Sequence, residues 1–152
     1  MMKELVIQSD VNNLGKVEDF VCALCDEKNI HNYFAVISMA VLQAVENAIV
    51  HGNRGDHDKR VKISCANSAD GVALTIEDEG AGFDFESYGD IPAEGCAGVG
   101  IFMMKMLANG LKFSDGGRRV RLHFRIDGID EAIACERVAV LKKFYKASLV
   151  EA

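Results

Sequence analysis

A single apolar run, Asn32 to Val50, sets the strongest limit on how this chain can fold. The run is too long for a β-strand and is rich in good helix formers, so we predict a helix that ends at Gly52. Because few of its positions are polar, most of this helix must lie in the interior. With 152 residues and 49% hydrophobic content, the chain is long enough to bury one core and too short for two ordinary domains.

Charge and cysteine content indicate which partners and which cellular compartment to expect for this protein. The formal net charge is −6, and because DNA and anionic membranes attract proteins through a positive field, we expect neither as a partner. The N-terminal apolar run is too short for a signal peptide, and no window holds eighteen consecutive apolar residues, so we expect no membrane-spanning helix and a cytoplasmic protein. The five cysteines suit a reducing compartment, and Cys22 and Cys25 favour core packing over metal binding.

The remaining patterns predict a two-layer arrangement. In the first half they indicate a strand at Lys3 to Gln8, a helix from Val11 to about Lys28, the long apolar helix, and a hairpin of Arg60 to Ala66 with Val72 to Glu77. In the second half they indicate a loop from Glu79 to Gly98, a helix from Val99 to about Asn109, strands at Leu111 to Ser114 and Arg119 to Ile126, and a helix from Ile129 to Leu149. We therefore predict an α/β (α+β) two-layer sandwich with helices on one face of a mixed, mostly antiparallel sheet.

Two amides interrupt the long apolar helix. Gln43 and Asn47 are four residues apart, which places them on one helical face, one turn above the other. Such side chains are costly in an interior unless their hydrogen-bonding groups are satisfied. Taken alone, the pair favours hydrogen bonds to neighbouring backbone over a binding role.

Two glycine-containing motifs have the chemistry of a nucleotide site. Asp78, at the end of a strand, can accept a hydrogen bond from an exocyclic amine, while Gly80 and Gly82 allow a sharp turn and a close approach of ligand to backbone. Gly98-Val99-Gly100 opens a helix, where free N–H groups favour phosphate. Each motif alone is a weak signal, because an acidic turn or a loop-to-helix junction has the same composition.

Together and in this order, the three motifs resemble the N, G1 and G2 boxes of the histidine-kinase-like ATPase superfamily, which has the Bergerat-type ATP-binding fold. The wording N-A-x-x-H-G from Asn47, a short lid and the ending G-G-R-R-V-R-L-H-F are most similar to the bacterial anti-sigma-factor serine/threonine kinases. The resemblance covers residues 3–126, which we expect to form the ATP-binding domain. Residues 129–149 are then an additional C-terminal helix, packed on the same domain or on the partner in a homodimer.

The resemblance implies roles for the site residues, with ATP or ADP and Mg²⁺ as cofactors. Asn47 would coordinate Mg²⁺ through its side-chain oxygen, and Asp78 would bind the adenine amine. The other nucleotide-binding positions would be His51, Gly80, Gly82, Gly98, Val99, Gly100 and Arg118, and the loop from Asp84 to Ala97 would be the lid. The implied partners are a sigma factor, an antagonist of the anti-sigma factor, or both.

Two positions depart from the serine-kinase pattern. The family usually has a catalytic glutamate where this chain has Gln43, and because an amide cannot take a proton at neutral pH, its loss would lower turnover by about two to four powers of ten. Glu46 is the alternative proton acceptor, although it lies about 60° around the helix from Gln43. The family commonly has threonine where this chain has Arg118, which either points outward or reaches a phosphate.

We therefore expect an ATP-binding regulator of transcription that acts through protein–protein binding, with weakened or absent kinase activity. Two alternatives stay open: an active serine/threonine protein kinase that phosphorylates the antagonist, and an interaction module that binds no nucleotide. The catalytic half of a two-component histidine kinase is disfavoured, because this sequence has no upstream dimerisation helix with a phosphorylatable histidine.

Overall fold

The computed structural model describes residues 3–68, 70–82, 96–126 and 138–143, with the backbone alone described at 96–99. Its elements are β1 (Lys3–Gln8), α1 (Leu14–Lys28), α2 (Phe34–Asn47), β2 (Arg60–Ser68), β3 (Gly71–Glu77), α3 (Cys96–Leu107), β4 (Gly110–Ser114) and β5 (Arg119–Arg125). Short 3₁₀ turns at Val11–Asn13 and His31–Tyr33 lead into α1 and α2, and a third at Asp115–Gly117 joins β4 to β5. Residues 138–143 are also helical.

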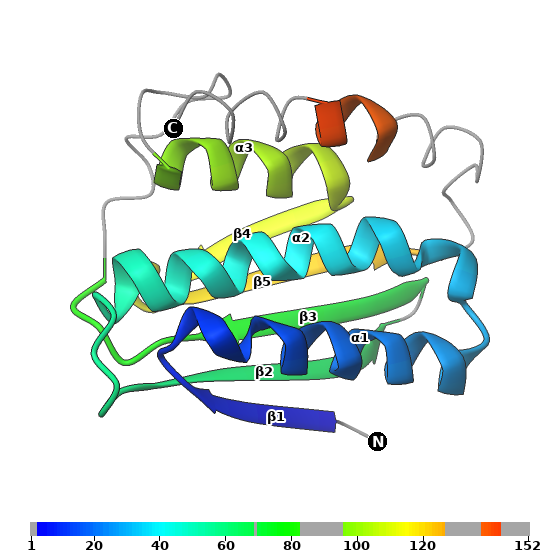
Figure 1. Ribbon diagram of the computed structural model, residues 1–152. Helices are drawn as coiled ribbons and strands as arrows, with labels where there is room; N and C mark the ends of the chain where they lie inside the picture. Colours follow the sequence, from blue (N-terminus) through cyan, green and yellow to red (C-terminus); the bar gives the residue numbers. More distant parts are fainter. Residues whose placement is uncertain (1–2, 69, 83–95, 127–137, 144–152) are drawn as a thin grey trace.

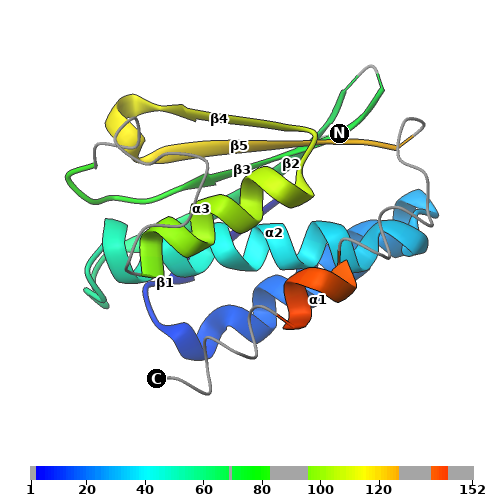
Figure 2. The ribbon, with the colours of Figure 1, turned by 90° about the horizontal axis from the view of Figure 1, so that it is seen from above.

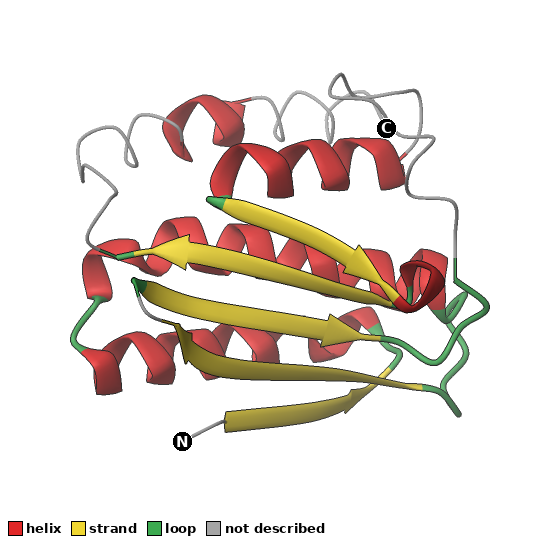
Figure 3. Ribbon diagram, turned by 180° about the vertical axis from the view of Figure 1, so that it is seen from behind, coloured by secondary structure: helices red, strands yellow, loops and turns green. Residues whose placement is uncertain are grey.

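The five strands form one sheet in the order β1-β2-β3-β5-β4, and every pairing is antiparallel. The two predicted hairpins, β2 with β3 and β4 with β5, are both present, and β3 pairs with β5 to join them. Helices α1, α2 and α3 lie on one face of the sheet (Figure 1, and from above in Figure 2). Seen from behind, the same sheet has an open face that these helices do not cover (Figure 3). The predicted two-layer fold is confirmed.

The core lies between this sheet and α2. Alternation in β5 turns Val120, Leu122 and Phe124 inward, with at most 6% of each exposed, and leaves the intervening residues on the open face. Helix α2 supplies the facing layer, with Val36, Ile37, Ser38, Ala40, Val41, Ala44 and Val45 all buried. Because α2 packs against the sheet and against both α1 and α3, its apolar surface is covered on most sides.

The apolar run is therefore the central helical segment of the fold. The stretch His31–Gly52 has 22 residues, and its most apolar 18-residue window has a mean hydropathy of 1.6, so that by length and composition alone it could cross a membrane. Of the window that meets this test, 56% is buried inside the protein, and core helices of folded domains meet the same test.

The ends of α2 and α3 differ from the predicted ends. Regular α-helix stops at Asn47 and continues as a π-helical turn, Ala48–Gly52, in which the Asn53 N–H donates to the Ala48 carbonyl at 2.7 Å. Helix α3 begins at Cys96 instead of Val99, so the predicted phosphate motif lies inside the helix and the last residues of the predicted lid are helical. The rest of that lid lies outside the described residues.

The described part of the C-terminal segment packs on the main core. Val138 and Leu141 are 6% and 3% exposed and belong to the same hydrophobic cluster as α2 and the sheet. Ala134 and Tyr145, which the pattern places on the same helical face, lie outside the described residues. Of the two cysteines predicted to pack in the core, Cys25 is a buried free thiol, while Cys22 is only partly buried. Burial raises the pKa of Cys25 to about 11.

Candidate functional site

A pocket of about 70 Å³ opens between α2, α3 and the adjoining ends of β3 and β5. Its polar groups are Asn47, His51, Asp78 and Arg118, four of the residues that the sequence singles out. Its walls are mainly apolar and come from Ala44, Ala48, Ile76, Met104, Phe113 and Val120, with backbone at Gly52 and Gly117. An apolar slot with a few polar groups is the usual form of a site for a flat ring.

Asp78 is fixed in this pocket by close backbone packing. A Cβ at Gly52 would lie 2.3 Å from Asp78 Oδ2, and a Cβ at Gly80 would lie 1.9 Å from the Gly52 carbonyl oxygen, so both positions need glycine. The Asp78 N–H donates to the Arg118 carbonyl at 2.9 Å, and Asp78 Oδ1 accepts from the Gly80 N–H at 2.8 Å. Oδ2 accepts no hydrogen bond from the described residues, which leaves one carboxylate oxygen for a ligand.

The charge of Asp78 is held in a partly dry environment. Burial raises the pKa of this carboxyl above its ordinary value of 3.8, while the hydrogen bond from Gly80 and the cations of Arg118 and Lys59 act in the opposite direction. A perturbed carboxyl in a cleft is a common mark of a functional site.

Asn47 joins the pocket to the start of α3. The Asn47 side chain is partly buried and makes no hydrogen bond with the described residues. A Cβ at Gly100 would lie 2.9 Å from its Nδ2 and 3.0 Å from its Oδ1, so the helix backbone packs directly on the amide. Gly98 and Val99 lie in the first turn of α3, and the Gly98 N–H is among the donors at a helix start that have no partner within the helix. The Asn47 amide and this helix start therefore lie at one junction, which suits an anion with its cation.

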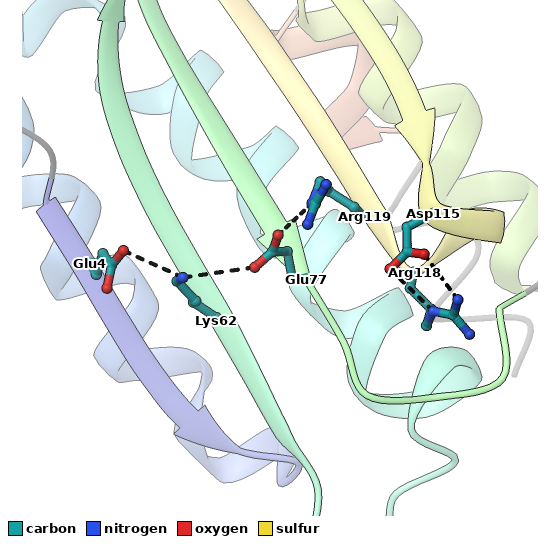
Figure 4. A network of polar contacts seen from close by, with 6 residues as sticks. All are labelled: Glu4, Lys62, Glu77, Asp115, Arg118 and Arg119. Carbon is teal, nitrogen blue, oxygen red and sulfur yellow. Dashed lines mark hydrogen bonds and ion pairs between the residues drawn. The ribbon is translucent and has the colours of Figure 1, made fainter.

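Two further glycines and an ion pair close the other side of the pocket. Gly82 has a φ of +85°, and a Cβ there would lie 2.2 Å from the Gly116 carbonyl oxygen in the turn between β4 and β5. Asp115 in that turn holds Arg118 at the rim, with Oδ1 accepting from Nη2 at 2.9 Å and Oδ2 from Nε at 3.3 Å (Figure 4). This hydrogen-bonded pair lowers the pKa of Asp115 and raises the pKa of Arg118. The guanidinium is thus bound to the turn at the edge of the pocket.

Gln43 and Glu46 line a different cavity. A groove of about 340 Å³ runs between α1, α2, α3 and residues 138–143, and both side chains face it together with Glu18, Met103 and Lys142. Gln43 and Asn47 are only about 40° apart around the helix. The contact of α3 with α2 divides them, because Met103 faces the groove while Met104 faces the pocket. Whether Gln43 or Glu46 takes part in chemistry stays a prediction.

Asn53 is the residue of this region that the sequence analysis missed. It is 1% exposed, its Nδ2 donates to Ser9 Oγ at 2.7 Å and to the Arg60 carbonyl at 3.0 Å, and its Oδ1 accepts from the Glu79 N–H at 2.8 Å. One side chain therefore ties the exit of α2 to β1, to β2 and to the turn after β3. Its position directly after N-A-x-x-H-G was the only available signal, and asparagine is equally common in exposed turns.

Comparisons with known proteins identify the family of this chain. The chain matches the histidine kinase-like ATPase domain over residues 7–124, and it therefore belongs to that family, whose domain implies nucleotide binding. It is also similar to proteins named anti-sigma F factor from three strains of Clostridium perfringens, with 42% identity over 48 residues, which is 32% of this chain and 34% of each relative. The match thus spans about a third of the length of these relatives.

Replacing Asn53 should destabilise the fold. In Asn53→Ala the Glu79 N–H and the Arg60 carbonyl lose a buried partner, so we expect the free energy of unfolding to fall by about 1–3 kcal/mol in urea denaturation. The control is Asn12→Ala, at an exposed position, with an expected change below about 0.5 kcal/mol. Equal losses in the two variants would contradict this role for Asn53.

The pH dependence of stability should reveal the burial of Asp78. Because its pKa is raised on folding, the stability associated with this group is lost as pH rises from 3.8 through the folded-state pKa. Asp78→Asn, which keeps an acceptor for Gly80, should therefore have a higher Tm than the wild type at pH 7, with a difference that shrinks toward pH 3.8.

Asp115→Asn is the matched control with the opposite sign. The pKa of Asp115 is lowered on folding, so its stabilisation is present at neutral pH and is lost as pH falls through the folded-state pKa. This variant should have a lower Tm than the wild type at neutral pH. A Tm change of the same sign in both variants would contradict the opposite pKa shifts assigned to Asp78 and Asp115.

Proposed function

We propose that this chain is an ATP- or ADP-binding regulator that controls transcription by holding a sigma factor until an antagonist protein displaces it, with phosphoryl transfer weak or absent. The observation that carries the proposal is the meeting of Asp78 and Asn47 in one pocket, with Gly100 packed on Asn47, inside a histidine kinase-like ATPase domain. The name of its relatives, anti-sigma F factor, supports the choice of partners. A cytoplasmic location accords with that role.

The lining of the pocket supports adenine nucleotide as the ligand. The free Oδ2 of Asp78 accepts from the adenine amine, and the apolar walls that include Ile76 and Val120 enclose the ring. The turn at Gly80 and Gly82 lets the ring approach the backbone, because a Cβ at either position would already collide with neighbouring backbone.

The phosphates belong at the junction of α2 with α3. The N–H groups of Gly98 and Val99 in the first turn of α3 bind phosphate oxygens, with Gly100 giving room beside Asn47. The Asn47 amide oxygen, a hard ligand with no other partner among the described residues, would hold Mg²⁺ there. The ion would neutralise phosphate charge. His51 and Arg118 at the rim bind the ribose or a phosphate.

The position and chemistry of Gln43 support weak phosphoryl transfer. Its amide is neutral and can orient a hydroxyl without taking its proton. Gln43 faces the groove, so an acceptor side chain would have to enter from that side to meet it. Glu46 faces the same groove and is the one carboxylate on α2 near that route, which keeps an active kinase as the second candidate.

Calorimetry with ATP and with ADP tests the nucleotide site. The wild type should bind both, and Asp78→Asn should weaken binding by about ten- to 150-fold, because the lost hydrogen bond involves a charged acceptor. Asp70→Asn, at the opposite end of β3, should bind like the wild type. No binding at about millimolar nucleotide would contradict the proposal and favour an interaction module without nucleotide.

Phosphoryl transfer tests the role of Gln43. With labelled ATP, Mg²⁺ and an antagonist of anti-sigma F factor as acceptor, we expect little transfer by the wild type and an increase of about 100-fold or more in Gln43→Glu, which restores a base. Nucleotide affinity should be the same in both. Rapid transfer by the wild type that Glu46→Gln abolishes would instead establish the active kinase.

A further inference from the structure

The open face of the sheet has a charge opposite to that of the rest of the chain. Outward-facing strand positions hold six cations, Arg60, Lys62, Lys112, Arg119, Arg121 and Arg125, and two carboxylates, Glu4 and Glu77. This face therefore has a formal charge of +4, while the whole chain has −6 and the remaining residues together have −10. Such a separation of charge gives the open face a positive field in an acidic protein.

One row of this face is neutralised within the protein. Lys62 Nζ lies 3.4 Å from Glu4 Oε1 and 3.9 Å from Glu77 Oε2, and Glu77 also accepts from the guanidinium of Arg119. Figure 4 shows this chain of ion pairs running across four side chains on neighbouring strands. The carboxylates of the face are therefore already engaged.

In the adjacent row, two cations have no counter-charge among the described residues. Lys112 on β4 lies directly opposite Arg121 on β5, and Arg121 lies opposite Thr75 on β3, which lies opposite Ser64 on β2. The row ends at Glu4 on β1, whose carboxylate already belongs to the ion-paired row. Lys112 and Arg121 are both exposed, and neither makes an ion pair with a described residue. Because two like charges directly across an antiparallel pair are destabilising, the sheet keeps an unfavourable pair beside two hydroxyl groups.

We propose that this row, Lys112, Arg121, Thr75 and Ser64, is a docking surface for an acidic segment of a partner protein. Carboxylates of such a segment would supply the missing counter-charge to Lys112 and Arg121 and accept from the hydroxyls of Thr75 and Ser64. The row lies on the face of the sheet opposite the nucleotide pocket, whose lining residues Ile76 and Val120 point toward the helices.

The charge distribution favours an acidic protein segment over a nucleic acid or a second copy of this chain as the occupant of the row. A long nucleic acid would extend beyond the row and meet the field of the acidic remainder of the chain. A symmetric contact between two copies of this face would place Lys112 and Arg121 against cations of the same kind. A short acidic segment matches the row without either penalty.

The Lys112→Glu variant distinguishes a loss of peptide binding from a loss of folding stability, because the two should change in opposite directions. This change turns the like-charge pair with Arg121 into an opposite-charge pair, so the Tm should rise by about 1–4 °C. The same change should weaken binding of a fluorescent poly-glutamate peptide of about ten residues by about tenfold or more, measured by anisotropy at about 50 mM NaCl. Lys16→Glu, an equal change of charge at an exposed position of α1, should alter peptide binding by less than about twofold.

Several results would overturn the proposal. They are no binding of poly-glutamate by the wild type, equal weakening by Lys16→Glu and Lys112→Glu, a Tm that falls in Lys112→Glu, and tighter binding of single-stranded DNA of equal length. The wild-type affinity for poly-glutamate should also fall as NaCl is raised to about 300 mM, because exposed charges are screened over a shorter distance. An affinity that does not change with salt would equally exclude a charged docking surface.

Discussion

The nucleotide end of the molecule depends on one close backbone approach, between the π-helical turn that ends α2 and the segment that follows β3. Gly52 lies against the Asp78 carboxylate and Gly80 lies against the Gly52 carbonyl, and a single Cβ at either glycine would push the two segments apart. Asn53 then binds the same turn to the N–H of Glu79. The end of α2 and the end of β3 are therefore packed directly against each other. Asp78 is positioned by this backbone packing before any ligand binds, as an efficient site requires.

The sequence predicted most of the architecture because the signals involved are local. Alternation in β5 and the long apolar run of α2 are properties of single segments, and both were confirmed with ends within a few residues. The π-helical turn at Ala48–Gly52 was not predicted, because a shift of one backbone hydrogen bond leaves no mark in composition. Asn53 was missed because its burial comes from three segments that are far apart in the chain.

The separation of the pocket from the groove shows that residue spacing along a helix does not predict which cavity a side chain faces. A separation of four residues gives the angle between Gln43 and Asn47 on the helix, and that angle is small. Their surroundings are decided by α3, where the neighbours Met103 and Met104 face the groove and the pocket respectively. The same spacing could place two residues in one site or in two adjacent ones. Helix packing, which depends on tertiary contacts, makes the choice here.

In two places, this domain keeps polar or charged side chains in surroundings that destabilise the fold. Asp78 is held in a partly dry pocket beside Asn47, whose amide has no hydrogen-bond partner among the described residues, and Lys112 faces Arg121 on the open sheet face. A sequence selected for stability alone would remove such features, which is why we propose both as binding positions. Both places adjoin β3 and β5, whose residues point alternately to the two faces. If nucleotide binding shifts these strands, linkage requires that a partner on the open face change nucleotide affinity by the same factor.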